Sequence, residues 1–352
     1  MSTRLSTIQT AAGIRTPFEV RYFDNTSLTA STTLSASSGC SRSALPNGPD
    51  SQGRLQCLLE VAAATQESNM PQIPETSSNA AQIEYWNTTA GETWAQFQEA
   101  LDRQVEPLGL AAMDVLCPGE GEHIIDIGCG CGQTSLALAA RVRPTGSVVG
   151  VDISEPMLDV ALRRPRSADL QVAFRKLDAQ TGDIGHGLFD AAFSRFGVMF
   201  FSDPVAAFAN IRASLKPDGR LAFVCWRPLN ENPWMQAPLQ AALPLLPPVA
   251  PPDPTAPGPF AFADPSRVRS ILADSGYGSV TIDPFDTDIG GGDLEQTLKL
   301  ALAVGPLGRA LREHPELADN VIDAVRDVLS NYLTSNGVRM LGAVWIVLAR
   351  TS

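Results

Sequence analysis

The stretch that decides the fold of this chain is His123-Ile-Ile-Asp-Ile-Gly-Cys-Gly-Cys-Gly-Gln-Thr-Ser135. A short apolar run leads into Gly128, Gly130 and Gly132, and the apolar spacing after Gln133 is typical of a helix. Glycines permit positive φ and let a ligand approach the backbone, while the N-terminus of the helix offers free N–H groups. The stretch therefore predicts a strand, a ligand-binding loop and a helix in direct succession.

Strand and helix patterns alternate downstream of this loop. A second strand over Ser147–Val151 ends at Asp152, and Ser154 is placed to act as N-cap of the next helix. Further predicted elements are strands at Leu170–Arg175, Phe189–Ser194 and Gly219–Trp226, with a helix at Val205–Leu215. This alternation indicates βαβ units and a parallel sheet that is covered by helices on both faces.

The pattern changes after residue 226. Between Pro244 and Pro259, eight of sixteen residues are proline, which predicts a stiff extended loop. The remaining predicted elements are a helix at Ser266–Ser275, a strand at Gly278–Asp283, helices at Leu294–Leu311 and Pro315–Leu333, and a last strand at Met340–Ala349. Residues 228–262 and 290–336 are interpreted as insertions that form a lid over the ligand edge of the sheet. Plain packing of these helices is an equally compatible interpretation.

The N-terminal region differs from the rest in composition. Twenty of the first 69 residues are Ser or Thr, so this part cannot bury much surface. We expect residues 1–79 to be a disordered or dispensable extension and residues 80–352 to form the folded domain. Two alternatives stay open, namely an organellar targeting segment and a natural start at Met70. The folded part is predicted to begin with a helical lead-in, where Trp94, Phe97 and Leu101 recur at helical spacing.

Charge and cysteine content exclude several classes of partner. The net charge of −12 argues against nucleic acid and anionic membrane surfaces, which attract Lys/Arg-rich faces. The sequence has no apolar run of the roughly 20 residues that a transmembrane helix needs. Six cysteines and three histidines show no metal-ligand spacing, and the simplest interpretation is reduced thiols in a cytoplasmic protein that binds no metal. A homo-oligomer is neither predicted nor excluded.

Three acidic residues indicate what the loop binds. Asp126, two residues before Gly128, would repel a pyrophosphate but suits a ligand that carries an ammonium and a sulfonium. Asp152 can accept both ribose hydroxyls of an adenosine. Asp178, after the third strand, can accept from the adenine amino group. The glycine spacing alone also permits an NAD(P)-dependent oxidoreductase, which remains an alternative.

Four motifs together resemble those of class I S-adenosylmethionine (SAM)-dependent methyltransferases, in particular the ubiquinone/menaquinone biosynthesis superfamily. They are Asp-Ile-Gly-Cys-Gly-Cys-Gly (126–132), Val-Asp-Ile-Ser-Glu-Pro-Met (151–157), Leu-Asp-Ala (177–179) and Pro-Asp-Gly-Arg-Leu (217–221). The match covers roughly residues 80–226. The resemblance implies SAM as cofactor and an α/β fold: a Rossmann-like, mostly parallel seven-stranded sheet with an antiparallel last strand, helices on both faces and helical lid insertions.

The resemblance also implies roles for individual residues. Asp126, Gly128 and Gly130 should lie beside the methionine portion of SAM, and Asp152 should hold the ribose. The other cofactor-binding candidates are Gly132 in the loop, Ile153 and Met157 beside the adenosine, Asp178 and Ala179 at the adenine, Ser194 and Phe196 near the sulfonium, and Trp94, with Tyr85 and Trp86, in an aromatic cover.

Methyl transfer from a sulfonium needs mainly alignment of the nucleophile and exclusion of water. Arg195 is a candidate for orienting the acceptor, with an ion pair to a nearby acid as the alternative. His314 is the histidine that could reach the cleft, because His123 and His186 belong at the opposite edge of the sheet. A surface residue at a helix end is the alternative for His314. An apolar lid favours a small apolar acceptor such as a quinone precursor, an aromatic natural product or a lipid-like molecule. The acceptor atom is undetermined, and a non-catalytic SAM-binding regulator remains a second alternative.

Overall fold

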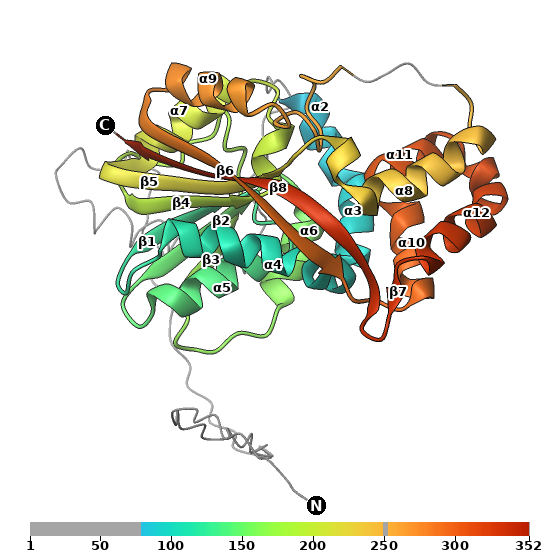
Figure 1. Cartoon of the computed structure of the whole chain (residues 1–352). Helices are drawn as coiled ribbons and strands as arrows, with labels where there is room; N and C mark the ends of the chain where they lie inside the picture. Colours follow the sequence, from blue (N-terminus) through green and yellow to red (C-terminus); the bar gives the residue numbers. More distant parts are fainter. Residues whose placement is uncertain (1–78, 249–252, 352) are drawn as a thin grey trace, which may run out of the picture. The chain divides into compact units, whose positions relative to one another are not determined.

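The computed structural model describes residues 79–248 and 253–351, and the extension predicted over residues 1–79 lies, except for Asn79, outside the described residues. A single sheet has the strand order β3-β2-β1-β4-β5-β8-β6, and the short β7 pairs with β8 off this path (Figure 1). Its strands are β1 (His123–Ile127), β2 (Ser147–Asp152), β3 (Val172–Lys176), β4 (Phe189–Arg195), β5 (Leu215–Trp226), β6 (Tyr277–Gly290), β7 (Leu333–Thr334) and β8 (Gly337–Thr351).

The strand directions explain where a ligand can enter. β1 pairs in parallel with both β2 and β4, so the strand order reverses at β1. In open α/β sheets, such a reversal leaves a crevice outside the carboxyl ends of the strands. β8 lies between β5 and β6 and is antiparallel to both, which confirms the predicted antiparallel last strand.

Helices cover both faces of the sheet. Figure 1 shows α4 (Gln98–Leu116) and α5 (Gln133–Val142) on one face and α7 (Pro204–Ser214) and α9 (Pro265–Asp274) on the other. The strands between them are apolar and almost fully buried, as parallel strands covered on both sides must be. The predicted fold class is therefore confirmed. The remaining core helix is α6 (Glu155–Arg163), which follows β2.

Two elements differ from the prediction. The single helix expected over Leu294–Leu311 is two helices, α10 (Leu294–Ala303) and α11 (Gly305–Glu313). The break falls at Val304, whose backbone is extended. Gly305, with a φ of +70°, and Pro306, which has no N–H to continue the helix, then begin α11. β6 extends through Gly290 instead of ending near Asp283, because it pairs with β8 along its whole length although its own sequence is polar.

The C-terminal helices form a group of their own. α8 (Pro233–Ala242), α10, α11 and α12 (Ala318–Ser330) lie together beside the far end of the β6–β8 pair (Figure 1). Leu298, Leu307, Val321 and Val325 belong to the apolar cluster inside this group, which is separate from the core of the sheet. The helices are thus built as a unit, and their role as a lid stays a prediction.

The lead-in consists of α2 (Ala80–Asn87), α3 (Thr89–Gln96) and α4. Leu101, Val105 and Leu108 of α4 are buried, as their helical spacing predicts. No helix in the described part of the chain is long and apolar enough to cross a membrane.

Candidate active site

A cavity of about 130 Å³ opens at the carboxyl ends of β1 to β4, the position that the strand order predicts. Its walls come from the segments that follow these four strands and from the lead-in helices. The lining residues after the strands are Gly128, Cys129, Gly130 and Cys131, then Asp152 and Ile153, then Leu177, Asp178 and Ala179, then Phe196 and Gly197. This arrangement brings most of the predicted cofactor-binding residues together.

The glycine loop is shaped by close packing. Gly128 has a φ of +65°, and a Cβ added to it would lie 2.8 Å from the Cα of Gly197, so the two backbones touch. Gly130, with a φ of +53°, faces the cavity near Met157. Gly132 has a different role: a Cβ there would lie 2.7 Å from Phe174, and Gly132 is not among the described residues that line the cavity. It allows α5 to approach β3 closely.

The backbone N–H groups of the loop indicate whether the loop can bind the pyrophosphate of a dinucleotide. Four of the five backbone N–H groups from 128 to 132 donate within the protein. Gly128 and Cys129 both donate to the carbonyl of Val151, and Gly132 donates to that of Cys129. A dinucleotide loop instead aims such groups at the pyrophosphate. The loop is therefore poorly suited to a pyrophosphate.

Asp152 ties the loop to the next strand and faces the cavity. Its Oδ2 accepts from the Gly130 N–H at 2.8 Å, and its Oδ1 accepts from the Ser154 N–H at 2.8 Å. Burial raises the pKa of this carboxyl, and the backbone N–H groups oppose that shift. A carboxylate has about four acceptor sites, so capacity remains for ligand hydroxyls. Asp152 lines the cavity, and its contact with the ribose stays a prediction.

Asp178 lies at the end of the cavity beyond β3. Its carboxylate accepts from the Gln180 N–H at 2.9 Å and from the Thr181 hydroxyl at 2.9 Å, which holds the side chain in place. Ala179 lines the cavity beside it. Both residues line the cavity, and their contact with the adenine stays a prediction.

An aromatic cover closes one side of the cavity. The Trp86 ring meets Trp94 and Phe200 edge to face, at centroid distances of 5.9 and 4.9 Å, and all three rings line the cavity, whereas Tyr85 is exposed. The Ser154 hydroxyl donates to the Trp86 carbonyl at 2.7 Å. Ser154 therefore occupies the N-cap position of α6 but fastens the cover instead of capping the helix, contrary to the prediction.

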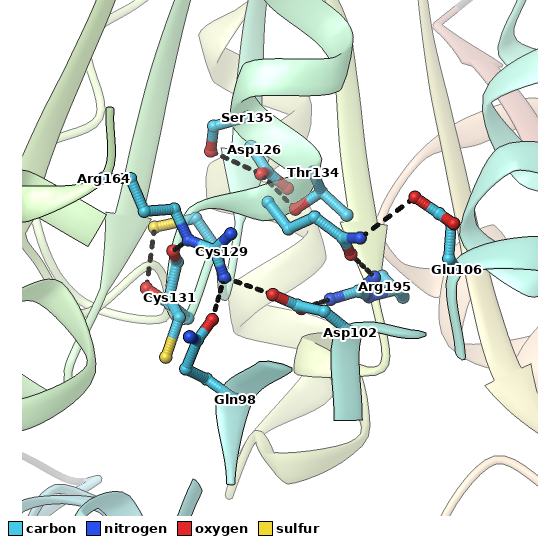
Figure 2. Close-up of polar contacts among 12 residues, drawn as sticks. Gln98, Asp102, Glu106, Asp126, Cys129, Cys131, Thr134, Ser135, Arg164 and Arg195 are labelled. Carbon is cyan, nitrogen blue, oxygen red and sulfur yellow. Dashed lines mark hydrogen bonds and ion pairs between the residues drawn. The ribbon is translucent and has the colours of Figure 1, made fainter. Parts of the chain in front are cut away.

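Asp126 lies one layer behind the cavity. It is fully buried, and its Oδ2 accepts from the hydroxyls of Thr134 at 2.7 Å and Ser135 at 2.6 Å (Figure 2). Thr134, not Asp126, lines the cavity. Oδ1 of Asp126 is buried and has no hydrogen-bond partner among the described residues. Burial raises the pKa of Asp126 to about 6. A half-satisfied buried carboxylate fits a nearby cationic ligand, whose charge would offset the cost of burying it.

Replacing Asp126 with Asn is expected to stabilise the ligand-free protein at pH 8. The pKa of about 6 in the folded protein exceeds the ordinary aspartate pKa of 3.8, so the wild-type free energy of unfolding falls as pH rises through this window. The difference of about two pKa units corresponds to roughly 3 kcal/mol as an upper bound. Urea denaturation at pH 5 and pH 8 checks this. An advantage of Asp126→Asn that is equal at both pH values contradicts it.

Arg195 and Arg164 converge on one carboxylate at the cavity mouth. Arg195 donates to Oδ1 of Asp102 at 3.1 Å, and Arg164 pairs with Oδ2 of the same residue (Figure 2). Arg195 also donates to the side chain of Gln133, and its aliphatic stem lies against Gly109 of α4. The ion pair that the sequence left as an alternative is thus present. Arg195 and Arg164 thus share the carboxylate of Asp102 beside the cavity.

The Asp102 cluster was not predicted. Asp102 and Gln98 lie one turn apart on α4 and both line the cavity, and Gln98 accepts from Arg164. Their spacing of four residues predicts only that they share a helix face. That this face points at the mouth of the cavity depends on how α4 crosses the sheet.

Two predicted residues lie elsewhere. Ser194 is fully buried behind the wall and is not among the described residues that line the cavity. His314 follows α11 and is partly exposed, with Nδ1 3.4 Å from a carboxylate oxygen of Glu316, and it too is absent from the described lining. A place at the end of an outer helix explains its surroundings better than a role in the cleft.

Comparison with known proteins agrees with this geometry. Residues 124–219 match a protein family described as a methyltransferase domain. Over 118 residues, the chain is 32% identical to the aklanonic acid methyltransferase DauC of Streptomyces sp. (strain C5), a stretch that covers 33% of this chain and 54% of that protein. It is 33% identical over 117 residues to a demethylmenaquinone methyltransferase of Thermus thermophilus, covering 33% of this chain and 53% of that protein. The chain thus spans about half the length of these curated relatives.

Among solved structures, the phosphoethanolamine N-methyltransferase 2 of Haemonchus contortus in complex with S-adenosyl-L-methionine aligns with a TM-score of 0.48 and 15% identity. The alignment covers 80% of this chain and 62% of that chain.

Proposed function

We propose that this chain, a member of the class I SAM-dependent methyltransferases, transfers a methyl group from SAM to a small, fairly apolar acceptor. The observation that carries the proposal is the pairing of Asp152 with a glycine loop whose amides are already engaged. Such a loop accepts a nucleoside through its hydroxyls and offers little to a phosphate.

Different residues of the cavity bind different parts of SAM. Asp152 accepts the ribose hydroxyls, and Asp178 with Ala179 borders the adenine. Ile153 and Met157 supply apolar contact below the aromatic cover of Trp86 and Trp94. Gly128 and Gly130 let the methionine portion approach the backbone, and Asp126 provides negative charge behind Thr134.

SAM, when bound, supplies an activated methyl group on a sulfonium. The protein then has to hold the acceptor in line and exclude water, which can be worth effective molarities on the order of 10⁵–10⁸ M. Phe196 and the aromatic cover exclude water from the cavity. The Arg195 guanidinium, which lines the cavity, attracts an oxygen of the acceptor. A phenol or an acidic carbon needs no strong general base.

The substrate class follows from the apolar walls and from the names of the relatives. Aklanonic acid and demethylmenaquinone, after which two of the relatives are named, are consistent with an aromatic or quinone-like acceptor. We also infer a cytoplasmic site of action with a small-molecule partner and not a nucleic acid. The free thiols of Cys117, Cys129, Cys131 and Cys225 and the net charge of −12 support this.

Incubation of the full chain with methyl-labelled SAM and an extract of small aromatic metabolites tests the proposed activity. The expected result is label in an organic-soluble product together with S-adenosylhomocysteine (SAH). Binding of SAH without labelled product in any fraction supports a non-catalytic SAM-binding protein instead.

Arg195→Ala is expected to lower the rate of methyl transfer about 10- to 100-fold while changing the SAH affinity less than about threefold, the scale expected for loss of one charged contact to the acceptor. The fold should persist, because Asp102 keeps its ion pair with Arg164. Arg195→Met retains the stem that packs against Gly109 and serves as the control for packing. Equal loss of SAH binding and of turnover would assign Arg195 to the cofactor.

A further inference from the structure

A second, smaller cavity lies under the C-terminal helices. It has a volume of about 30 Å³, against about 130 Å³ for the first cavity, and its walls come from α4, β6, β8 and the helices α8, α10, α11 and α12. We call it the lid cavity. Most of its lining is aliphatic, with Leu300, Leu307, Leu329 and Met340 among the residues.

Gln104 is an exception in this apolar lining. It stands on α4 and is 7% exposed, and its side chain forms no hydrogen bond with any other described residue. Trp234 of α8 lines the same cavity, and its Nε1–H is also buried without an acceptor among the described residues. Two N–H donors therefore lie unused at one apolar site.

The size of the lid cavity explains how the donors are satisfied without a ligand. One water needs about 10–15 Å³ of such volume, so the cavity has room for about two. Water at this place can be displaced at little cost by a ligand atom that accepts the same hydrogen bonds. Since the Trp234 indole donates only, that atom must be an acceptor.

The lid cavity adjoins the first cavity. Leu101 lines the first cavity and packs in one cluster with Leu300 and Val304, which line the lid cavity. On another side, the ring of Phe196, which lines the first cavity, stacks on that of Trp226 at a centroid distance of 4.2 Å. The Trp226 ring contacts that of Trp234 at a centroid distance of 5.0 Å. Apolar side chains of these two groups thus lie between the two cavities.

We propose that the lid cavity binds a carbonyl oxygen on an otherwise apolar methyl acceptor, with the Gln104 amide as its anchor. The proposal rests on the proposed function and narrows the acceptor to an apolar ketone or quinone. Gln104 and Trp234 determine specificity together, because an acceptor without the oxygen leaves the buried Trp234 N–H and the Gln104 amide without an acceptor. Discrimination of this kind exceeds what an apolar pocket alone achieves.

Two matched probes test the proposal on the full chain: 1-tetralone, and tetralin, which has the same ring system without the oxygen. The five Trp indole N–H signals in a ¹H–¹⁵N spectrum report the site, and Trp234→Phe assigns the relevant signal. We expect 1-tetralone to shift the Trp234 signal and to bind at least fivefold more tightly than tetralin. Equal affinities, or shifts confined to Trp86 and Trp94, overturn the proposal.

Gln104→Met keeps the side-chain volume and removes the amide, so the fold should be retained. The substitution is expected to lower the affinity for 1-tetralone about five- to tenfold, the equivalent of one hydrogen bond. The affinity for tetralin should change less than about twofold. Unchanged 1-tetralone affinity overturns the proposal. A parallel SAH titration distinguishes failure of this inference from failure of the proposed function. SAH binding without selective 1-tetralone binding rejects only this inference, whereas the absence of SAH binding rejects the proposed function.

Discussion

Asp152→Ala is expected to weaken SAH binding about a hundredfold. The carboxylate of Asp152 is buried at the end of β2 and lines the main cavity. Its loss removes two charge-assisted hydrogen bonds to the ribose, each worth about 1.5 kcal/mol or more. Isothermal titration with SAH measures the change. Asp169→Ala, which removes an exposed carboxylate in the turn before β3, is the control and should bind SAH normally.

Asp152 also accepts the N–H groups of Gly130 and Ser154, so its removal could act through the loop. A double-mutant cycle separates the two effects. An SAH analogue that lacks both ribose hydroxyls should bind the wild type about as weakly as SAH binds Asp152→Ala. The Asp152→Ala substitution should change the affinity for that analogue little. Independent, additive losses would show that Asp152 supports only the loop.

Gly128→Ala is expected to destabilise the fold by about 2–4 kcal/mol and to lower SAH affinity at least tenfold. The positive φ of +65° costs an alanine about 1–2 kcal/mol, and the new Cβ would lie 2.8 Å from the Cα of Gly197. Both glycines line the cavity, so any relief of this contact moves its wall. Urea denaturation and SAH titration report the two effects.

Gly187→Ala is the matched control for Gly128→Ala. Gly187 has nearly the same φ, +62°, but nothing lies within 4 Å of an added Cβ. Gly187→Ala should therefore lose only the folding stability that a positive φ costs an alanine, and its SAH affinity should be unchanged. If the two variants lose equal stability and both keep SAH affinity, the close approach of Gly128 and Gly197 has no role in the site.

The central α/β unit could be predicted from sequence because its signals are local. The strand that ends at Ile127, the glycines after it and the acid at the end of the next strand each impose backbone geometry within a few residues. The antiparallel position of β8 followed from the resemblance and is confirmed. These features place Asp152, Asp178 and Gly130 around one cavity.

Other features depend on contacts between distant segments. The pairing of Asp102 with Arg164 and Arg195 joins residues 62 and 93 positions apart, and no local spacing predicts it. Likewise, β6 is longer than its polar sequence predicts, because β8 supplies a partner along its length. For His314, the sequence allowed a place in the cleft or one at a helix end, and the structure places it directly after α11 and partly exposed.

Thermal unfolding of the wild-type protein with SAH, NADH or NADPH tests the central claim most directly. A ligand at 100 times its Kd stabilises the folded state by about 2.7 kcal/mol, which raises the midpoint by several degrees. The account predicts that SAH produces this rise and that neither nicotinamide nucleotide does at the same concentration. A rise with NADH or NADPH and none with SAH would contradict it.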